Sequence, residues 1–213
     1  MVKIYYAYTG ITEDKSIEEM GKDLPLFLVS KFQKLRRDED RRLLYLSMAL
    51  LTKALCENGY NNFRPGDLQY SEAGRPFFPN APFDFNISHT DGCAAVAFSD
   101  DCRVGIDVEK IKAIDFSDFT GYFTSEQWND IHDADDKLIK FYYYWTLIES
   151  GAKADGRGLS LVFSESLKLT NGALFIDNVK WHYNHLNFDP LVSCCLTAGK
   201  NHTGPEVINI KSI

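Results

Sequence analysis

The strongest chemical signal in the sequence is the run Gly105-Ile106-Asp107-Val108-Glu109. On a strand, residues two apart share a face, so the carboxylates of Asp107 and Glu109 project together. Ile106 and Val108 then turn to the core, and Gly105 leaves room for a close neighbour. Two carboxylates on one face repel each other unless a cation lies between them, and Mg²⁺ bound to substrate phosphates is the natural candidate. For this motif alone, an exposed acidic strand edge is the favoured alternative.

A second set of polar residues recurs along a predicted helix. Trp145, Glu149 and Lys153 are spaced by four residues, which places them on one helix face. Alone, the Glu149 and Lys153 pair would be an ordinary surface ion pair worth about 0.3 to 0.5 kcal/mol. Gly156 and Gly158 follow directly, however, and glycines let the backbone approach a ligand. The helix end is therefore a candidate binding element.

Two further groups suit an anion. Asn86, Ser88 and His89 end an apolar run, where they either close a turn or form an anion pocket. Six basic residues lie before and within the start of the first long predicted helix: Lys31, Lys34, Arg36, Arg37, Arg41 and Arg42. Such a run is usually a solvated face, but in an acidic protein it also suits a polyphosphate or an acidic partner.

Composition limits the class of protein. The chain has 213 residues, 45% hydrophobic and 14% aromatic, enough for one large core or two small ones. With 23 basic and 30 acidic residues its net charge is −7, which disfavours a general nucleic-acid binder. We expect a cytoplasmic protein with no membrane span and no signal peptide, because no apolar stretch is long enough. Five cysteines without a C-x-x-C pair indicate reduced thiols.

The elements that must position these residues follow an α+β pattern. A strand is expected at Val2 to Tyr8 and a helix at Asp38 to Leu55, followed by short strands up to Glu109. The second half starts with a capping box at Thr124 and a helix from Asp136 to Ala154, and continues with strands joined by a turn at Asn171-Gly172. The pattern predicts two similar lobes that meet near residues 100–103 and pack against each other.

Four stretches in this order resemble the Sfp-type 4′-phosphopantetheinyl transferases: Gly74-Arg75-Pro76, Phe85 to Thr90, Gly105 to Glu109, and Trp145 to Leu159. The resemblance covers roughly positions 30 to 170 and is specific only in combination. It implies an α+β pseudo-dimer, in which each lobe is an antiparallel sheet packed with helices. The N-terminal lobe would span 1–102 and the C-terminal lobe, with the metal site, 103–213. Coenzyme A would bind in the cleft between the lobes of a monomer with an internal pseudo-twofold.

The resemblance also implies an activity and a set of roles. Such an enzyme transfers 4′-phosphopantetheine from coenzyme A to a serine of an apo acyl or peptidyl carrier protein and releases 3′,5′-ADP. Mg²⁺ would be held by Asp107, Glu109 and Glu149. Glu149 would also deprotonate the serine, directly or through water, and Lys153 would contact phosphate. The adenosine end and 3′-phosphate would meet residues from three segments: Arg41 or its neighbour Arg42, Gly74, Arg75 and Pro76, and Ser88 and His89.

Three residues depart from the family pattern. Arg75 replaces the usual lysine of the G-K-P motif and changes the donor geometry. Ile148 replaces a lysine, and Gly151 lies inside a helix at a cost of about 1 kcal/mol relative to alanine. The alternatives to an active transferase are a catalytically weakened coenzyme A-binding module of the same fold and a two-lobed structural protein. All three proposed Mg²⁺ ligands are present, which favours the enzyme.

Four aromatic residues close in sequence offer a contact surface for the carrier protein: Phe116, Phe119, Tyr122 and Phe123. Carrier proteins of this reaction are acidic, as the resemblance implies, so overall charge would repel them from this acidic chain. We expect at least one of the four rings to be exposed and to pack against the carrier.

Overall fold

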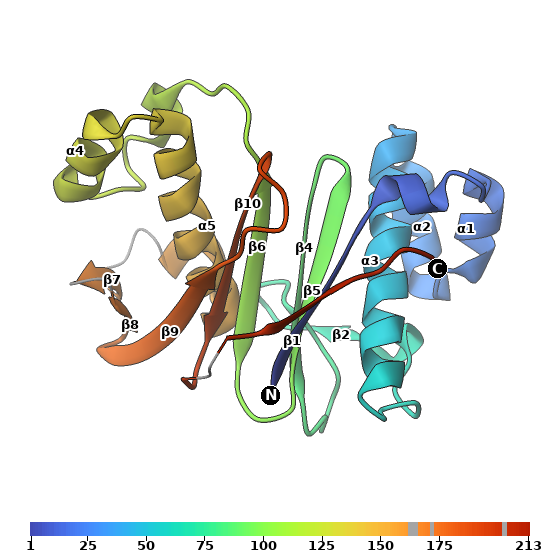
Figure 1. Ribbon diagram of the computed structural model, residues 1–213. Coiled ribbons are helices and arrows are strands. Elements are labelled where there is room, and N and C mark those ends of the chain that lie inside the picture. The colour runs from blue at the N-terminus through green and yellow to red at the C-terminus, as the bar shows by residue number, and fades with distance from the viewer. Residues whose placement is uncertain (162–165, 171–172, 202–203) are drawn as a thin grey trace.

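Two sheets lie between two groups of helices in the computed structural model, which describes residues 1–161, 166–170, 173–201 and 204–213 (Figure 1). Helix α3 (Asp38–Glu57) covers the outer face of one sheet, with α1 (Ile17–Asp23) and α2 (Leu26–Lys34) beyond it. Helix α5 (Lys137–Asp155), with α4 (Ser125–Asp133) beside it, covers the outer face of the other. The inner faces of the sheets pack on each other. The predicted α+β class with two lobes is confirmed.

The N-terminal lobe has a four-stranded sheet in the order β11-β1-β5-β4. Its strands are β1 (Val2–Tyr8), β4 (Asp84–Thr90), β5 (Cys93–Ser99) and β11 (Glu206–Asn209), with a separate small pair, β2 (Gln69–Tyr70) and β3 (Pro76–Phe77). Its helices are α1 (Ile17–Asp23), α2 (Leu26–Lys34) and α3 (Asp38–Glu57), with 3-10 turns at Thr9–Thr12 and Pro65–Asp67. The predicted strand and long helix are both present.

The C-terminal lobe has a five-stranded antiparallel sheet in the order β6-β10-β9-β8-β7. Its strands are β6 (Val104–Lys110), β7 (Leu167–Thr170), β8 (Ala173–Ile176), β9 (Val179–His185) and β10 (Val192–Ala198). Its helices are α4 (Ser125–Asp133) and α5 (Lys137–Asp155), with 3-10 turns at Phe116–Phe119 and Gly158–Leu161. The predicted turn at Asn171-Gly172 lies outside the described residues. None of the described helices is long and apolar enough to cross a bilayer.

Strand periodicity explains how each sheet serves two cores. In β1, Ile4 and Tyr6 face the other sheet, whereas Tyr5 and Ala7 face α3. Every residue of β5 is buried, and five of its seven residues are cysteine, alanine or serine. Small side chains suit a strand that is covered on both faces, because sheet and helix can approach closely.

The last strand corrects the predicted domain boundary. β11 pairs in parallel with β1, and Ile210 lies in the core beneath α3. The end of the chain therefore belongs to the N-terminal lobe, and the division into 1–102 and 103–213 is wrong for these residues. β11 covers a strand that would otherwise be a sheet edge.

The edges of the two sheets meet along β4 and β6 through side chains. Alternate side chains of β4 accept hydrogen bonds from alternate backbone N–H groups of β6. The pairs are Asp84 with Val104 (2.8 Å), Asn86 with Ile106 (2.9 Å), Ser88 with Val108 (3.2 Å) and Thr90 with Lys110 (2.9 Å). We call these four side chains and the edge of β6 the polar seam. It fixes the register of the two lobes, because each N–H group has its own acceptor.

Candidate active site at the junction of the lobes

Strand β6 lies directly against α5 at Gly105. A Cβ atom on this residue would lie 2.1 Å from the carbonyl oxygen of Ser150 and 2.3 Å from the backbone nitrogen of Ala154. No side chain other than hydrogen fits there, which confirms the expectation of a close neighbour at Gly105. The contact places the outward face of β6, with Asp107 and Glu109, beside the predicted helix face that carries Glu149 and Lys153.

Asp107 is the most deeply buried charged group of this junction, with 2% of its surface exposed. Its Oδ1 accepts hydrogen bonds from Lys153 Nζ at 2.6 Å and from Ser88 Oγ at 3.0 Å. Lys153 Nζ also donates to Ser88 Oγ at 3.0 Å. The second carboxylate oxygen, Oδ2, is buried without a hydrogen-bond partner among the described residues. Such an oxygen is an available ligand for a cation or a donor.

Glu109 and Glu149 complete a group of three carboxylates. Glu149 Oε2 lies 3.8 Å from Lys153 Nζ, and Trp145 Nε1 donates to Glu109 Oε1 at 3.4 Å. Burial, and then the charge of Asp107, raise the pKa of Glu109 to about 7. The same two causes raise the pKa of Glu149 to about 7. The junction therefore holds more negative charge than one lysine balances.

Lys153 is the cation that these carboxylates share. Burial lowers its pKa, but the charges of Asp107 and Glu149 outweigh burial, so that the pKa is raised. The ammonium group stays protonated at neutral pH. It is a donor placed between strand β4, strand β6 and its own helix.

The carboxylates fit a hard divalent cation. Mg²⁺ prefers oxygen ligands and uses one or two carboxylates together with water and substrate phosphates. The unpartnered Oδ2 of Asp107 leaves a place for a further positive charge, and the pKa values of Glu109 and Glu149 are raised first by burial and then by the charge of Asp107. Among the described residues, no three or more His, Cys, Asp or Glu side chains already form a metal site. The residues fit a metal that substrate oxygens help to hold.

The G-R-P segment lies next to Lys153. Gly74, in a turn with φ of 80°, and Pro76 line a small pocket of about 180 Å³ together with Lys153 and Gly156. This pocket joins the small β2–β3 pair of the N-terminal lobe to the end of α5. A ligand in it would touch both lobes.

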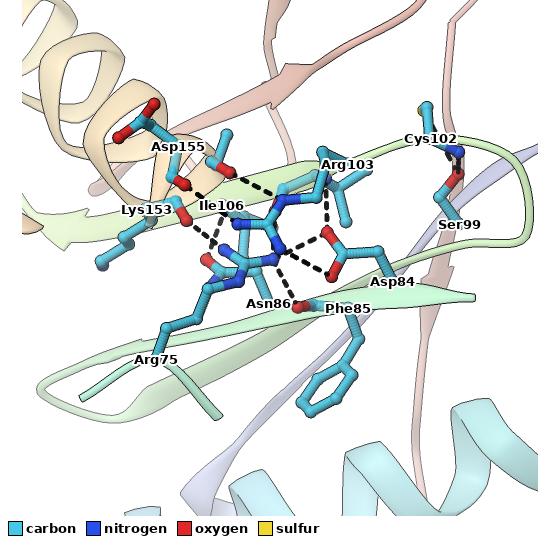
Figure 2. Close-up of polar contacts among 12 residues, drawn as sticks. Arg75, Asp84, Phe85, Asn86, Ser99, Cys102, Arg103, Ile106, Lys153 and Asp155 are labelled. Atoms are coloured by element: carbon cyan, nitrogen blue, oxygen red, sulfur yellow. Dashed lines mark hydrogen bonds and ion pairs between the residues drawn. The ribbon is translucent and has the colours of Figure 1, made fainter. Parts of the chain in front are cut away.

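The guanidinium of Arg75 points into the lobe junction, although the residue also lines the small pocket at Gly74 and Pro76. The side chain is 7% exposed and forms an ion pair with Asp84 at 2.7 Å. It also donates to the backbone carbonyls of Phe85, Val104 and Lys153 (Figure 2). Its Nη1 and Nη2 atoms are engaged within the protein, whereas its Nε is buried without a hydrogen-bond partner among the described residues, and the predicted contact with the 3′-phosphate stays a prediction.

His89 lies in a second, basic pocket. It is on the face of β4 opposite the polar seam and lines a pocket of about 420 Å³ with Lys31, Arg37 and Lys112. Asp40 and Asp91 also line this pocket, and both form ion pairs with Arg37. Desolvation, followed by the charges of Lys153 and Lys31, lowers the pKa of His89. Three basic groups around a histidine suit a phosphate. Two residues of the basic cluster, Lys31 and Arg37, thus lie beside His89.

Arg41 does not reach this pocket. Its guanidinium donates to Asp38 at 2.7 Å and to the carbonyl of Phe32 at 3.4 Å. Arg42 bonds to the carbonyl of Thr12. Lys31 and Arg37 line the pocket beside His89, whereas Arg41 and Arg42 are bonded elsewhere. The expected contact of Arg41, or its neighbour Arg42, with the 3′-phosphate stays a prediction.

The two departures on α5 are explained by packing. Ile148 is buried in an aromatic core with Phe123 and Phe141, away from the carboxylates. A Cβ atom on Gly151 would lie 3.0 Å from Leu174 Cδ2, so that glycine admits the neighbouring strand β8. Neither residue removes a group from the junction.

Two residues of the junction were missed from the sequence. Lys112 was not singled out because it is one of two lysines, with Lys110, at the end of a strand, and only the fold places it in the pocket with His89. Arg103 was read only as a lobe boundary, although its side chain donates to the carbonyls of Ala154 and Asp155. A basic residue directly before the G-I-D-V-E strand was the available signal.

Comparisons with known proteins agree with this junction. A family model described as the 4′-phosphopantetheinyl transferase superfamily matches residues 103–202. Two Bacillus subtilis proteins, 4′-phosphopantetheinyl transferase ffp and 4′-phosphopantetheinyl transferase Sfp, are each 32% identical over 170 residues, or 75% of this chain and 73% of theirs. A putative 4′-phosphopantetheinyl transferase of Haemophilus influenzae is 30% identical over 165 residues, or 73% of this chain and 69% of its own. The chain belongs to the Sfp-type 4′-phosphopantetheinyl transferases.

Proposed function

We propose that this enzyme transfers 4′-phosphopantetheine from coenzyme A to a serine of an apo acyl or peptidyl carrier protein, with Mg²⁺, and releases 3′,5′-ADP. The serine oxygen forms a bond to the β-phosphorus while the bond to the departing 3′,5′-ADP breaks. The observation that carries the proposal is the junction where Asp107, Glu149 and Lys153 meet beside two pockets.

Glu149 is the proposed general base. A base works best when its pKa lies near the operating pH, and burial beside Asp107 brings Glu149 to about 7. Its position at the helix surface, with 16% of the side chain exposed, leaves a path for a hydroxyl group. The serine proton would pass to Glu149 directly or through water.

Lys153 is the proposed phosphate contact. Its ammonium has three donors, of which Asp107 and Ser88 use two in this structure. The 29% exposure of the side chain leaves the group open to a ligand. Mg²⁺, held by Asp107, Glu109 and Glu149, would supply charge neutralisation of the phosphate oxygens.

The nucleotide end is assigned to the two pockets along β4. The pocket at Gly74 and Pro76 adjoins Lys153, and the basic pocket around His89 suits the 3′-phosphate. Lys31, Arg37 and Lys112 supply positive charge there in place of Arg41. The ligand would thus run along one strand from the carboxylates to α3.

The carrier protein is assigned to the aromatic segment before α4. Phe123 is buried, whereas Phe116, Phe119 and Tyr122 are half-buried and keep part of their rings at the surface. We expect contact through these partly exposed edges, because the overall charge of −7 opposes docking of an acidic partner. We further propose a monomer in the cytoplasm, a compartment that suits five free cysteines.

The experiment is a transfer assay with coenzyme A, Mg²⁺ and a set of apo carrier proteins, read by intact mass. We expect one carrier to gain one phosphopantetheine group, and chelation of Mg²⁺ to abolish the gain. Coenzyme A binding by calorimetry without any transfer would favour the weakened binding module instead.

A further inference from the structure

The last turn of α5 is held by two arginines from outside the helix. Helix ends leave backbone carbonyls without partners inside the helix. Arg75 Nη1 donates to the carbonyl of Lys153. Arg103 Nε and Nη2 donate to the carbonyls of Ala154 at 3.2 Å and Asp155 at 3.0 Å (Figure 2). Three successive carbonyls at the negative end of the helix dipole thus receive cationic donors.

Asp84 ties both arginines to the polar seam. Its Oδ2 lies 2.7 Å from Arg75 Nη2 and its Oδ1 lies 3.8 Å from Arg103 Nη1. The same carboxylate accepts the backbone N–H of Val104 at 2.8 Å. We call Arg75, Asp84 and Arg103 the interlobe clamp. Figure 2 shows its two guanidinium groups side by side between β4 and the end of α5.

Gly156 makes room for the clamp. It ends α5 with a φ of 96°, a conformation that glycine adopts most easily. A Cβ atom there would lie 2.9 Å from Arg103 Nη2 and 3.4 Å from Arg75 Cδ. A side chain at this position would therefore push the guanidinium groups away from the helix end.

The clamp holds Lys153 at one end while the active site holds it at the other. The carbonyl of Lys153 is bound by Arg75, and its Nζ is bound by Ser88 and Asp107. Asp84 and Ser88 lie on the same face of β4, four residues apart. Strand β4 therefore sets the position of the last turn of α5 at two points.

We propose that Arg75, Asp84 and Arg103 are positioning residues for phosphoryl transfer, which act by fixing Lys153 relative to Ser88 and Asp107. The inference rests on the proposed function and assigns Arg75 to the protein interior instead of to the 3′-phosphate. Small displacements of a catalytic group cost up to about 100-fold in rate. Loss of the interlobe clamp should thus lower kcat rather than weaken the binding of coenzyme A.

The test compares coenzyme A with dephospho-coenzyme A, which lacks the 3′-phosphate, in wild-type and variant enzyme. Arg75→Lys keeps the charge but loses the planar fork that reaches several acceptors. We expect kcat to fall about 10- to 100-fold and KM for coenzyme A to change less than about threefold. The fall in kcat should be the same with both substrates. His89→Ala should lose more activity with coenzyme A than with dephospho-coenzyme A. Arg64→Gln, which changes an exposed arginine of the same lobe, should lose no activity with either substrate.

A second comparison separates positioning from a general loss of structure. In a Lys153→Met background, Arg75→Lys should lower the residual kcat by less than about twofold, because residues that act through each other are not additive. If Arg75→Lys fails to fold, Arg103→Gln, whose side chain is 47% exposed, replaces it in both comparisons. For this variant we expect kcat to fall by about threefold or more in the wild-type background and to stay unchanged in the Lys153→Met background.

Three results would overturn the inference: an unchanged kcat, a larger loss with coenzyme A than with dephospho-coenzyme A, or the same loss in the Lys153→Met background. A wild-type enzyme that modifies no carrier would contradict the proposed function itself. If the wild-type enzyme transfers phosphopantetheine and the Arg75→Lys variant is equally fast, only the positioning role of the interlobe clamp is contradicted.

Discussion

The space between the two sheets has two halves with different chemistry. One half is apolar and is filled by β1, β5 and β10 together with the inner face of β6. The other half is the polar seam, where side chains of β4 bond to the edge of β6. Apolar contacts are non-directional, so the first half stabilises the association without fixing its register. In the polar seam each N–H group of β6 has its own acceptor on β4, so the second half fixes the register in which the lobes meet.

The difference matters because the candidate active site belongs to the polar half. Ser88 accepts a hydrogen bond of the polar seam from Val108, and it is also a hydrogen-bond partner of Asp107 and Lys153. The apolar half should therefore determine stability, and the polar half should determine rate. Variants can break or sharpen this division.

The largest effect is expected from Glu149→Gln. The variant keeps the shape but cannot accept a proton, so transfer should slow by about 100- to 10,000-fold. Because a buried carboxylate beside Asp107 is removed, the free energy of unfolding should stay equal or rise. Intact-mass assays and urea unfolding measure the two quantities. A parallel loss of stability would show that Glu149 also holds the fold together.

Ile106→Ala tests the apolar half. Ile106 is fully buried between the sheets, and its loss should cost about 2 to 4 kcal/mol of unfolding free energy. The transfer rate per folded molecule should stay within about threefold of wild type, because the backbone of β6 keeps its bonds to β4. A rate loss as large as that of Glu149→Gln would contradict the division between the halves.

The pH dependence of stability should differ between wild type and Glu149→Gln. The pKa of Glu149 is about 7 in the folded state, above the ordinary value of about 4.3 for glutamate. The folded protein thus binds this proton more tightly than the unfolded chain does. Its free energy of unfolding therefore rises as the pH falls from 7 toward 4.3.

In metal-free buffer, the variant should be more stable than wild type by about 1 to 3 kcal/mol above pH 7. The advantage should disappear near pH 4, where the carboxyl is protonated in both states. Denaturant unfolding at several pH values measures the difference. An advantage that is independent of pH would have another cause.

The smallest effect on stability is expected from Ser88→Ala. One bond of the polar seam is lost, at a cost of about 1 kcal/mol. Transfer should slow about tenfold, because Lys153 and Asp107 lose a shared partner. Ser47→Ala, which removes a buried hydroxyl that donates to the carbonyl of Leu43 within α3, is the matched control and should change stability but leave the rate nearly unchanged.

Much of this fold and part of the site could be predicted from the sequence. Apolar periodicity located the long helices, and alternation placed Asp107 and Glu109 on one face of β6. Spacing of four placed Glu149 and Lys153 on one face of α5. These predictions succeed because they concern residues near each other in the chain, where the periods of helix and strand decide the geometry.

The remainder depended on long-range packing. Side-chain identity showed Arg75 as a cation but not that its partners would be carbonyls from three other segments. The packing of α2, of the start of α3 and of the segment after β6 decided that Lys31, Arg37 and Lys112, rather than Arg41, line the pocket beside His89. β11 is four residues long, too short for its periodicity to indicate which sheet it joins.

The most direct test of the proposed site is a crystal structure of the protein with Mg²⁺ and coenzyme A. We predict that the ligand lies along β4, with the 3′-phosphate beside His89 and Lys31 and the pyrophosphate beside Lys153. Oxygens of at least two of the residues Asp107, Glu109 and Glu149 should lie about 2.1 Å from the metal. Coenzyme A bound away from β4, or a metal held without these carboxylates, would contradict the assignment of the active site to the polar half of the lobe junction.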